Sequence, residues 1–380
     1  MSYLDKTLLN QFKSTINSTN IFYKSDRLKQ KYNLICVVLE RLESAVNYLN
    51  SHSEFPNSEE DFICFLVYAC MIKDGILKLL ESVFNKKPDF ILQKKYFKDV
   101  KLYSKNAFTE ETCPTDNAFF EYLRSMAFAH PFETSKEKRP RPFMEDGETH
   151  YCPWVIARND YGVGIRIYTS SDKFIIRDFT FDFNALKEYV KFLYNYLPTL
   201  NTWAKDEIIM QDRVWLQSKI DRTGTPNDIL KQIKKVYTER FFDTTDIEVI
   251  EEFLTCKTTN PCNAEIIRKY RLEIISTIHQ ICSALDNGDY EKLSRVTNNI
   301  SRRPKNAHPL MAYQMEKIFC YLDEDHDCFD VEWGRKQAEH FAKEFARKWV
   351  EIDAKNMSYS EIKLLVTIAC YYESREQEAQ

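Results

Sequence analysis

The chain has 380 residues, of which 44% are hydrophobic and 29% charged, a composition typical of a folded globular protein and not of a disordered one. Its formal net charge of −4 gives no overall attraction to nucleic acid, so any nucleic-acid contact needs a local basic patch. Only seven residues are glycine, which argues against folds with many tight turns or glycine-rich phosphate loops.

The amino-terminal half is dominated by helical periodicity. Ser58, followed by three acidic residues, has the character of an N-cap, and Thr115 offers another. The spacing of apolar residues predicts helices over 3–17, 24–50, 58–84 and 116–130, with two shorter helical pieces between 89 and 106.

Between residues 152 and 183 the period changes from helical to alternating. The sequence predicts three short strands over 154–157, 163–168 and 174–183, separated by glycine and Ser-Ser-Asp turns. We assign Trp154, Phe179 and Phe181 to the buried face of this sheet.

The rest of the chain is again helical, with a linker predicted at residues 222–226. Helices are expected over 183–200, 202–221, 226–241, 244–256, 262–286, 288–300, 308–323, 330–350 and 358–375. The predicted fold is therefore mainly α. It consists of a helical domain at 1–222, with a short antiparallel three-stranded insertion at about 152–183, and a second helical domain of unassigned role at 226–380.

Thiol usage and hydropathy predict a cytoplasmic protein. The eleven cysteines show no dense framework, and the amino terminus lacks a secretory pattern. The longest apolar stretch, residues 62–72, is too short for a membrane span, which needs about 20 residues. We expect reduced thiols and no membrane contact.

Several cofactor and metal motifs fail. Residues 162–167 carry two glycines of a dinucleotide fingerprint but lack the third and lead into no helix. The acidic run at 323–327 lacks the glycine and the final glutamate of a calcium loop. The His326/Cys328 and Cys256/Cys262 pairs have no partner pair at zinc spacing. No metal and no cofactor are expected.

One constellation remains, in the sequence Leu123-Arg124-Ser125-Met126-Ala127-Phe128-Ala129-His130-Pro131. Arg124 is followed by a small polar residue, and His130 comes after five intervening residues at the end of an amphipathic helix. This motif in helical context resembles the HEPN superfamily over roughly residues 1–200. The resemblance implies a helical bundle, a metal-independent ribonuclease of the toxin or phage-defence type, and a homodimer in which two subunits share the site. The family usually has Asn, Asp or His where this chain has Ser125.

The residue types suit metal-free RNA cleavage by the 2′-hydroxyl. Histidine titrates near neutrality and can transfer a proton, and arginine offers a permanently charged fork for phosphate oxygens. We therefore assign His130 to proton transfer and Arg124 to charge stabilisation, with Ser125 as the polar neighbour in the site. Six residues of ideal helix leave the two side chains about 120° apart, so Pro131 must end the helix at His130 or a second subunit must complete the site. The alternative is structural: Arg124 pairs with Glu121, and His130 packs beside Pro131.

A basic segment follows the motif and could hold phosphates through Lys136, Lys138, Arg139 and Arg141. Tyr122 and Phe132 are either core residues or platforms for unpaired bases. The sequence thus predicts an endoribonuclease with an RNA substrate, a homodimeric state and an antitoxin or defence-system partner. The competing hypothesis is a non-catalytic adaptor or sensor that binds RNA, nucleotide or protein.

Overall fold

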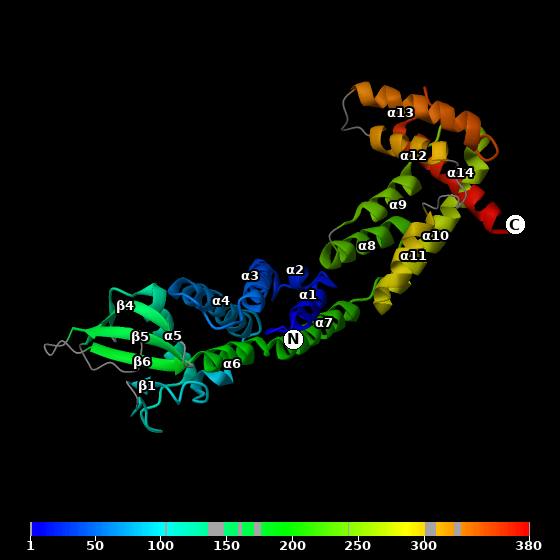
Figure 1. The fold of residues 1–380 in the computed structure, drawn as a ribbon. Coiled ribbons are helices and arrows are strands. Elements are labelled where there is room, and N and C mark those ends of the chain that lie inside the picture. The colour runs from blue at the N-terminus through cyan, green and yellow to red at the C-terminus, as the bar shows by residue number, and fades with distance from the viewer. Residues whose placement is uncertain are drawn as a thin grey trace. The chain divides into compact units, whose positions relative to one another are not determined.

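A computed structural model describes residues 2–102, 105–135, 148–158, 162–170, 176–241, 243–300, 309–322 and 328–379; the side chains of 135, 156–158 and 328–329 are not described. The chain forms two compact units, Met1–Ile209 and Met210–Gln380. The predicted mainly helical class with an antiparallel sheet insertion is confirmed (Figure 1).

The N-terminal unit contains the predicted helices, with shifted bounds and several irregular ends. They are α1 (Lys6–Asn17), α2 (Ile21–Lys24), η1 (Lys29–Lys31), α3 (Tyr32–Ser51), α4 (Glu59–Lys78), η2 (Leu79–Val83), η3 (Asp89–Leu92), α5 (Asp116–Arg124), η4 (Ser125–Ala129), α6 (Phe183–Tyr194) and the first part of α7 (Leu197–Gln217), whose residues from Met210 onward are assigned to the C-terminal unit. Here η1 and η3 are 3₁₀ turns, whereas η2 and η4 are π-helical. The predicted N-caps are present: Ser58 accepts from the Asp61 amide, and Thr115 accepts from the Ala118 amide.

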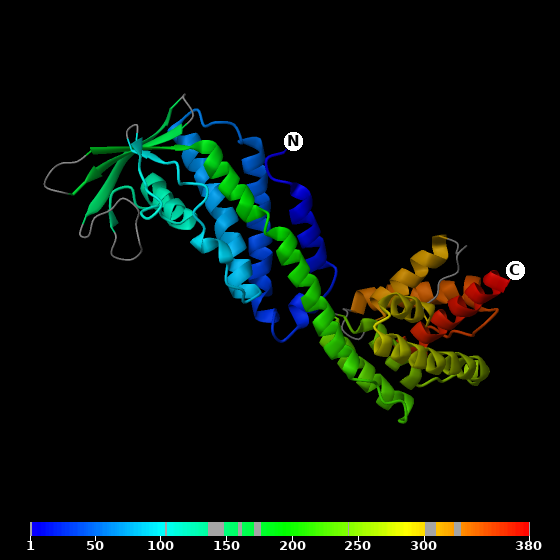
Figure 2. The same ribbon diagram turned by 90° about the horizontal axis from the view of Figure 1, so that it is seen from below.

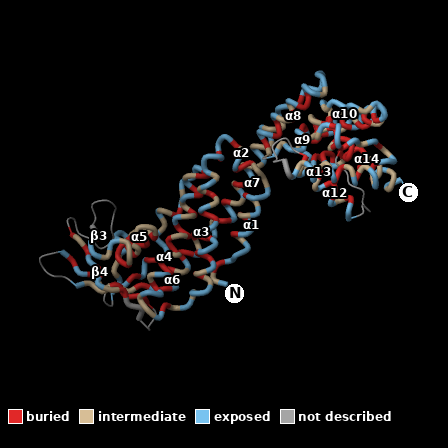
Figure 3. The backbone as a smooth tube through the Cα atoms, turned by 90° about the horizontal axis from the view of Figure 1, so that it is seen from above, coloured by how far each residue is buried: buried red, intermediate tan, exposed pale blue. Residues whose placement is uncertain are grey.

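The helices of this unit enclose a core rich in aromatic side chains. Phe12, Phe62, Phe65 and Tyr194 are among its large buried members, and Figure 3 shows buried positions recurring along α3, α4 and α6. Gly75 permits a close approach of α3 and α4, because a Cβ there would lie 3.1 Å from Leu42 Cδ2. Glycine at position 75 therefore has a specific role in packing these two helices.

The sheet has six described strands, all antiparallel, in the order β2-β1-β6-β5-β4-β3. They are β1 (Lys101–Leu102), β2 (Lys105–Asn106), β3 (Thr134–Ser135), β4 (Thr149–Arg158), β5 (Gly162–Thr169) and β6 (Ile176–Asp182). The three predicted strands correspond to β4, β5 and β6. The second helical piece expected before residue 106 was wrong, since β1 and β2 occupy that stretch; strands of two residues are too short to show a period.

One face of the sheet packs on helices and the other faces outward. Ile165, Phe179 and Phe181 are buried on the inner face, as predicted for the two phenylalanines. The assignment of Trp154 to the buried face was wrong, because Trp154 pairs across the strands with Arg166, which alternates with Ile165 and points outward. A bulge between Tyr151 and Trp154, which contains a proline, shifts the register. In Figure 2 the strands lie at one end of this unit, beside the helices.

The C-terminal unit follows the predicted helical pattern closely. Its elements are α8 (Pro226–Arg240), α9 (Thr245–Thr255), η5 (Pro261–Asn263), α10 (Ala264–Asn287), α11 (Tyr290–Ile300), α12 (Pro309–Tyr321), α13 (Cys328–Phe341), η6 (Ala342–Ala346) and α14 (Tyr359–Ala379). The segment expected to be a linker lies within this unit: Arg222 pairs with Asp286, and Thr225 forms a capping box with Asp228. Gly288 ends α10 with a φ of 67°, a conformation that favours glycine.

Two further findings concern membrane-spanning helices and the cysteines. In the part of the chain that the structure describes, no helix is both long and apolar enough to cross a lipid bilayer. The ten cysteines with described side chains are free thiols.

Asp116 fixes the start of α5, and with it the helix that carries the Arg124 motif. Asp116 is 1% exposed, and its carboxylate accepts hydrogen bonds from the amides of Lys95, Tyr96 and Phe97 at 2.8, 2.8 and 3.2 Å. Burial raises the pKa of this carboxyl, and the three amides oppose that rise. One side chain therefore anchors the preceding loop to the helix.

We expect Asp116→Ala to lower the unfolding free energy of the N-terminal unit by about 3 kcal/mol, because buried amides left without an acceptor cost roughly 1–3 kcal/mol each. Amide hydrogen exchange measured by mass spectrometry should accelerate over residues 93–97. Asp206→Ala, at an exposed position of α7, is the matched control. Unchanged protection of residues 93–97 in Asp116→Ala would contradict this role.

Candidate functional site

The predicted motif spans the junction between α5 and the π-helical turn η4. The inner side of this segment is held by Phe119, Phe120, Leu123 and Met126, which are all buried. The π-helical hydrogen bond runs from the His130 amide to the Ser125 carbonyl at 2.8 Å. Single π-helical turns of this kind occur frequently at functional sites. Arg124 and His130 are the residues that flank the turn on either side.

Arg124 stands half-exposed at the surface and is paired. Its side chain is 37% exposed, and Nη1 lies 3.3 Å from Glu121 Oε2. Glu121 also pairs with the ammonium of Lys73 on α4, and Asp74 lies 3.7 Å from the same ammonium. Two cations and two carboxylates therefore balance in this cluster. The Arg124–Glu121 pair is the structural alternative that the sequence left open.

Ser125 and His130 have opposite surroundings. Ser125 is 2% exposed within η4. His130 is exposed and leaves the helical region, with φ −144° and ψ 51°, so the helix ends before Pro131 as expected. The His130 carbonyl accepts from Thr134 Oγ1 at 2.8 Å, which ties the turn to β3.

The structure does not bring the side chains of Arg124 and His130 into a direct interaction. Within the described residues of this chain, the guanidinium pairs with Glu121, and the His130 ring makes no hydrogen bond or ion pair. Both side chains are accessible at the same end of the helix. For them to act on one phosphate, a bound substrate must contact both, or a second subunit must supply one of them.

The four predicted phosphate-binding residues, Lys136, Lys138, Arg139 and Arg141, lie outside the described residues. The two aromatic candidates are separated by the structure. Tyr122 is 2% exposed and belongs to the core, whereas Phe132 is 86% exposed and does not.

Sequence reasoning missed a buried polar network beside the motif, centred on His150 of β4. Tyr122 Oη lies 2.9 Å from His150 Nδ1, and His150 Nε2 lies 3.0 Å from Glu148 Oε2. Arg177 of β6 approaches the other oxygen of Glu148 at 3.7 Å. A neutral imidazole satisfies the chain, because Nε2–H donates to the carboxylate and Nδ1 accepts from the phenol. The network fastens α5 to the sheet.

The position of His150 explains why it was missed. The sequence places it next to a polar, proline-containing stretch that reads as a loop, and the bulge at Pro153 interrupts the alternation of β4. The pairing of His150 with Thr169, which continues the inward series of Ile165 and Ile167, is the signal that identifies it as inward-facing.

Burial shifts the pKa values of two side chains near α5, His150 and Cys70. It lowers the pKa of His150, against an opposing effect of Glu148 and in the same direction as Arg177. Burial also raises the pKa of the Cys70 thiol, near Arg124, to about 12. Cys70 is therefore protonated at neutral pH and is unsuited to act as a nucleophile.

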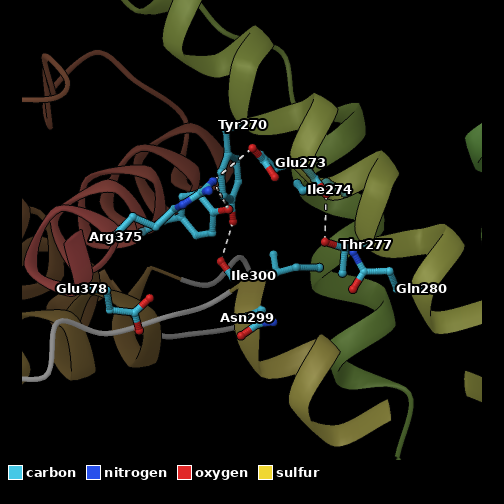
Figure 4. Close-up of a pocket in the computed structure, with 10 residues that line it drawn as sticks. Tyr270, Glu273, Ile274, Thr277, Gln280, Asn299, Ile300, Arg375 and Glu378 are labelled. Carbon is cyan, nitrogen blue, oxygen red and sulfur yellow. Dashed lines mark hydrogen bonds and ion pairs between the residues drawn. The ribbon is translucent and has the colours of Figure 1, made fainter. Parts of the chain in front are cut away.

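Described residues of the C-terminal unit line at least two cavities. One, of about 290 Å³, lies among α10, α11 and α14 (Figure 4). In it Arg375 pairs with Glu273 at 3.1 Å and donates to Tyr371 Oη at 3.2 Å, while Tyr270 Oη donates to the Ile300 carbonyl. The other, of about 770 Å³, is an open hollow beside η6 with mixed charges, including Lys343 and Asp353. Neither concentrates one kind of charge.

No group of three or more potential metal ligands is found among the described residues. Comparisons with protein-family models, with curated proteins and with solved structures each found no match to this chain. The assignment of function therefore depends on the residues themselves.

The His150 network predicts a specific pH dependence of stability. Unfolding returns His150 to an ordinary pKa near 6.5, above its lowered value in the folded state. Above about pH 7 the residue is neutral in both states and contributes no slope. As pH falls through 6.5 the unfolded state takes up the proton first, so stability falls until the folded pKa is reached.

We expect the N-terminal unit of the wild-type chain to lose stability as the pH falls below about 7, because the folded-state pKa of His150 is lowered, and His150→Gln to flatten this dependence. Urea unfolding read by pulse proteolysis, with fragments assigned by mass, follows this unit separately. His279→Gln, at an exposed position of α10, should leave the pH dependence unchanged. Equal slopes for wild type and His150→Gln would show that His150 is not the titrating group.

Proposed function

We propose that the protein is a metal-independent endoribonuclease of HEPN-like type that acts on RNA in the cytoplasm, as a toxin or defence effector. The observation that carries the proposal is the position of Arg124 and His130. One is half-exposed and one exposed, and they flank the same π-helical turn. A guanidinium and an imidazole are the two groups that metal-free phosphodiester cleavage needs.

In the proposed reaction the ribose 2′-oxygen attacks the adjacent phosphorus, and the bond from phosphorus to the 5′-oxygen breaks. The proton of the 2′-hydroxyl is removed, and the departing 5′-oxygen gains one. His130 carries out a proton transfer, and Arg124 stabilises the charge that develops on the phosphate oxygens. The products are a 2′,3′-cyclic phosphate and a 5′-hydroxyl.

The ion pair with Glu121 is compatible with this role. It holds the guanidinium in place by one nitrogen, Nη1, and a guanidinium has five N–H donors, so others can reach a phosphate. Since Arg124 and His130 do not meet within one chain, we propose that a homodimer completes the site from both subunits. An antitoxin or defence-system partner would act on the same surface.

We expect His130→Ala to reduce RNA cleavage by at least about 100-fold, as loss of general acid–base catalysis costs 10²–10⁴-fold. Arg124→Ala should cost about 10²–10³-fold, the size of one lost charge-stabilising donor group. The assay uses the full-length chain in EDTA with an unstructured oligoribonucleotide, and mass spectrometry identifies the termini formed.

The matched controls are His52→Ala and Arg41→Ala, both at exposed positions of the same unit, which should cleave like the wild type. Cleavage by His130→Ala at the wild-type rate would refute the site. Termini bearing a 3′-hydroxyl would refute the mechanism.

The charge balance around Glu121 favours a second candidate, a non-catalytic RNA-binding or adaptor module in which Arg124 only holds α5 to α4. Arg124→Lys separates the two. The lysine keeps the charge beside Glu121 but loses the planar fork. In the nuclease the variant keeps its stability and loses at least about 10-fold in rate; in the adaptor no RNA is cut by any variant, and Arg124→Ala lowers stability.

A further inference from the structure

The outward face of the sheet carries two adjacent tyrosines. Tyr151 of β4 and Tyr168 of β5 lie directly opposite each other in the ladder and are 37% and 41% exposed. Neither side chain makes a hydrogen bond or ring contact with another described residue. Opposed side chains on neighbouring strands lie about 5 Å apart at Cβ, so the two rings form one surface.

The next row of the same face adds a rigid planar group. The Arg166 guanidinium carbon lies 4.4 Å from the centre of the Trp154 ring, and Asp178 binds the guanidinium through both oxygens at 2.8 and 2.7 Å. The carboxylate of this row is thereby neutralised. One row further, Lys101 of β1 is exposed opposite Thr180. An anionic strand meets no unpaired carboxylate in these three rows.

The sheet edge links this face to the candidate site. Phe132 is 86% exposed and comes two residues after His130. The carbonyl of the intervening Pro131 accepts from the Cys152 amide at 2.8 Å, so Phe132 stands beside the strand segment that carries Tyr151. An exposed phenylalanine at this place has no role in the core.

We propose that the outward face binds unpaired RNA by base stacking on Tyr151 and Tyr168, with Phe132 directing the strand toward His130. Stacking on aromatic side chains is how proteins hold single strands without reading their sequence. The row of the two tyrosines also includes Ile176 of β6, which is 48% exposed opposite Tyr168. The next rows carry Arg166 with its paired Asp178, and Lys101, so flat rings lie next to cations on this face, an arrangement that suits stacked bases with their phosphates. The choice of RNA as occupant rests on the proposed function, and it narrows the substrate to single strands.

The test measures binding apart from cleavage, in the His130→Ala background with a 12-nucleotide oligoribonucleotide containing 2-aminopurine. Stacking should change the fluorescence of the probe on binding. We expect Tyr151→Leu/Tyr168→Leu to weaken affinity about 10- to 100-fold and Phe132→Ala about 5-fold, whereas Tyr151→Phe/Tyr168→Phe retains binding. The slope of affinity against salt should not change, because no phosphate contact is removed.

Tyr313→Ala, at a 43% exposed tyrosine of the C-terminal unit, is the matched control and should bind like its parent. Equal affinity of the leucine pair, or of an abasic strand, would overturn the proposal. So would loss of self-association, measured by sedimentation, with RNA binding intact, since the face would then be a protein interface. Tight tyrosine-dependent binding of an RNA that the wild type never cuts would refute the nuclease alone.

Discussion

Helix α5 is fixed by two consecutive residues that bind in opposite directions. Glu121 pairs with Lys73 of α4, and Tyr122 meets His150 of β4. Asp116 holds the other end of the helix to the preceding loop. Because α5 is clamped between the bundle and the sheet, the residues that follow it can take up an irregular π-helical turn without loosening the fold. Arg124, Ser125 and His130 all depend on that arrangement.

The clamp also divides the polar groups of this region into two kinds. Those turned inward, His150 and Glu148, are almost fully desolvated and satisfy one another. Those at the surface, Arg124 and His130, keep access to solvent. Chemistry on a polymer as large as RNA requires the second kind, and the first kind keeps them in place. The proposed roles follow this division.

The helices could be predicted because their apolar residues repeat over many turns and their caps are local, as at Ser58 and Thr115. The central strands could be predicted for the same reason. Side-chain partners could not, because they depend on which elements meet. The outward position of Trp154 follows from a bulge, the burial of His150 from strand register, and the pairing of Lys73 with Glu121 from helix packing. The Arg124–Glu121 pair, three residues apart on one helix, was accessible to local reasoning.

The outward face of the sheet gives this mainly helical protein a surface of exposed aromatic side chains, with Tyr151 and Tyr168 at its centre. Helices cover only the inner face, so the outward side chains contribute little to the core. Tyr151 and Tyr168 are therefore free to change without cost to folding, and the surface they form can vary while the bundle stays constant.

The π-helical turn has a bearing on how the motif tolerates change in length. A turn closed by a bond from residue 130 to residue 125 accommodates one more residue than the ordinary helical ladder. Removing a residue between Arg124 and His130 would restore an α-helical turn while Pro131 still ended the helix. A deletion of one residue can thus be absorbed locally, so the interval between the arginine and the histidine can shorten by one residue without disturbing the rest of the helix.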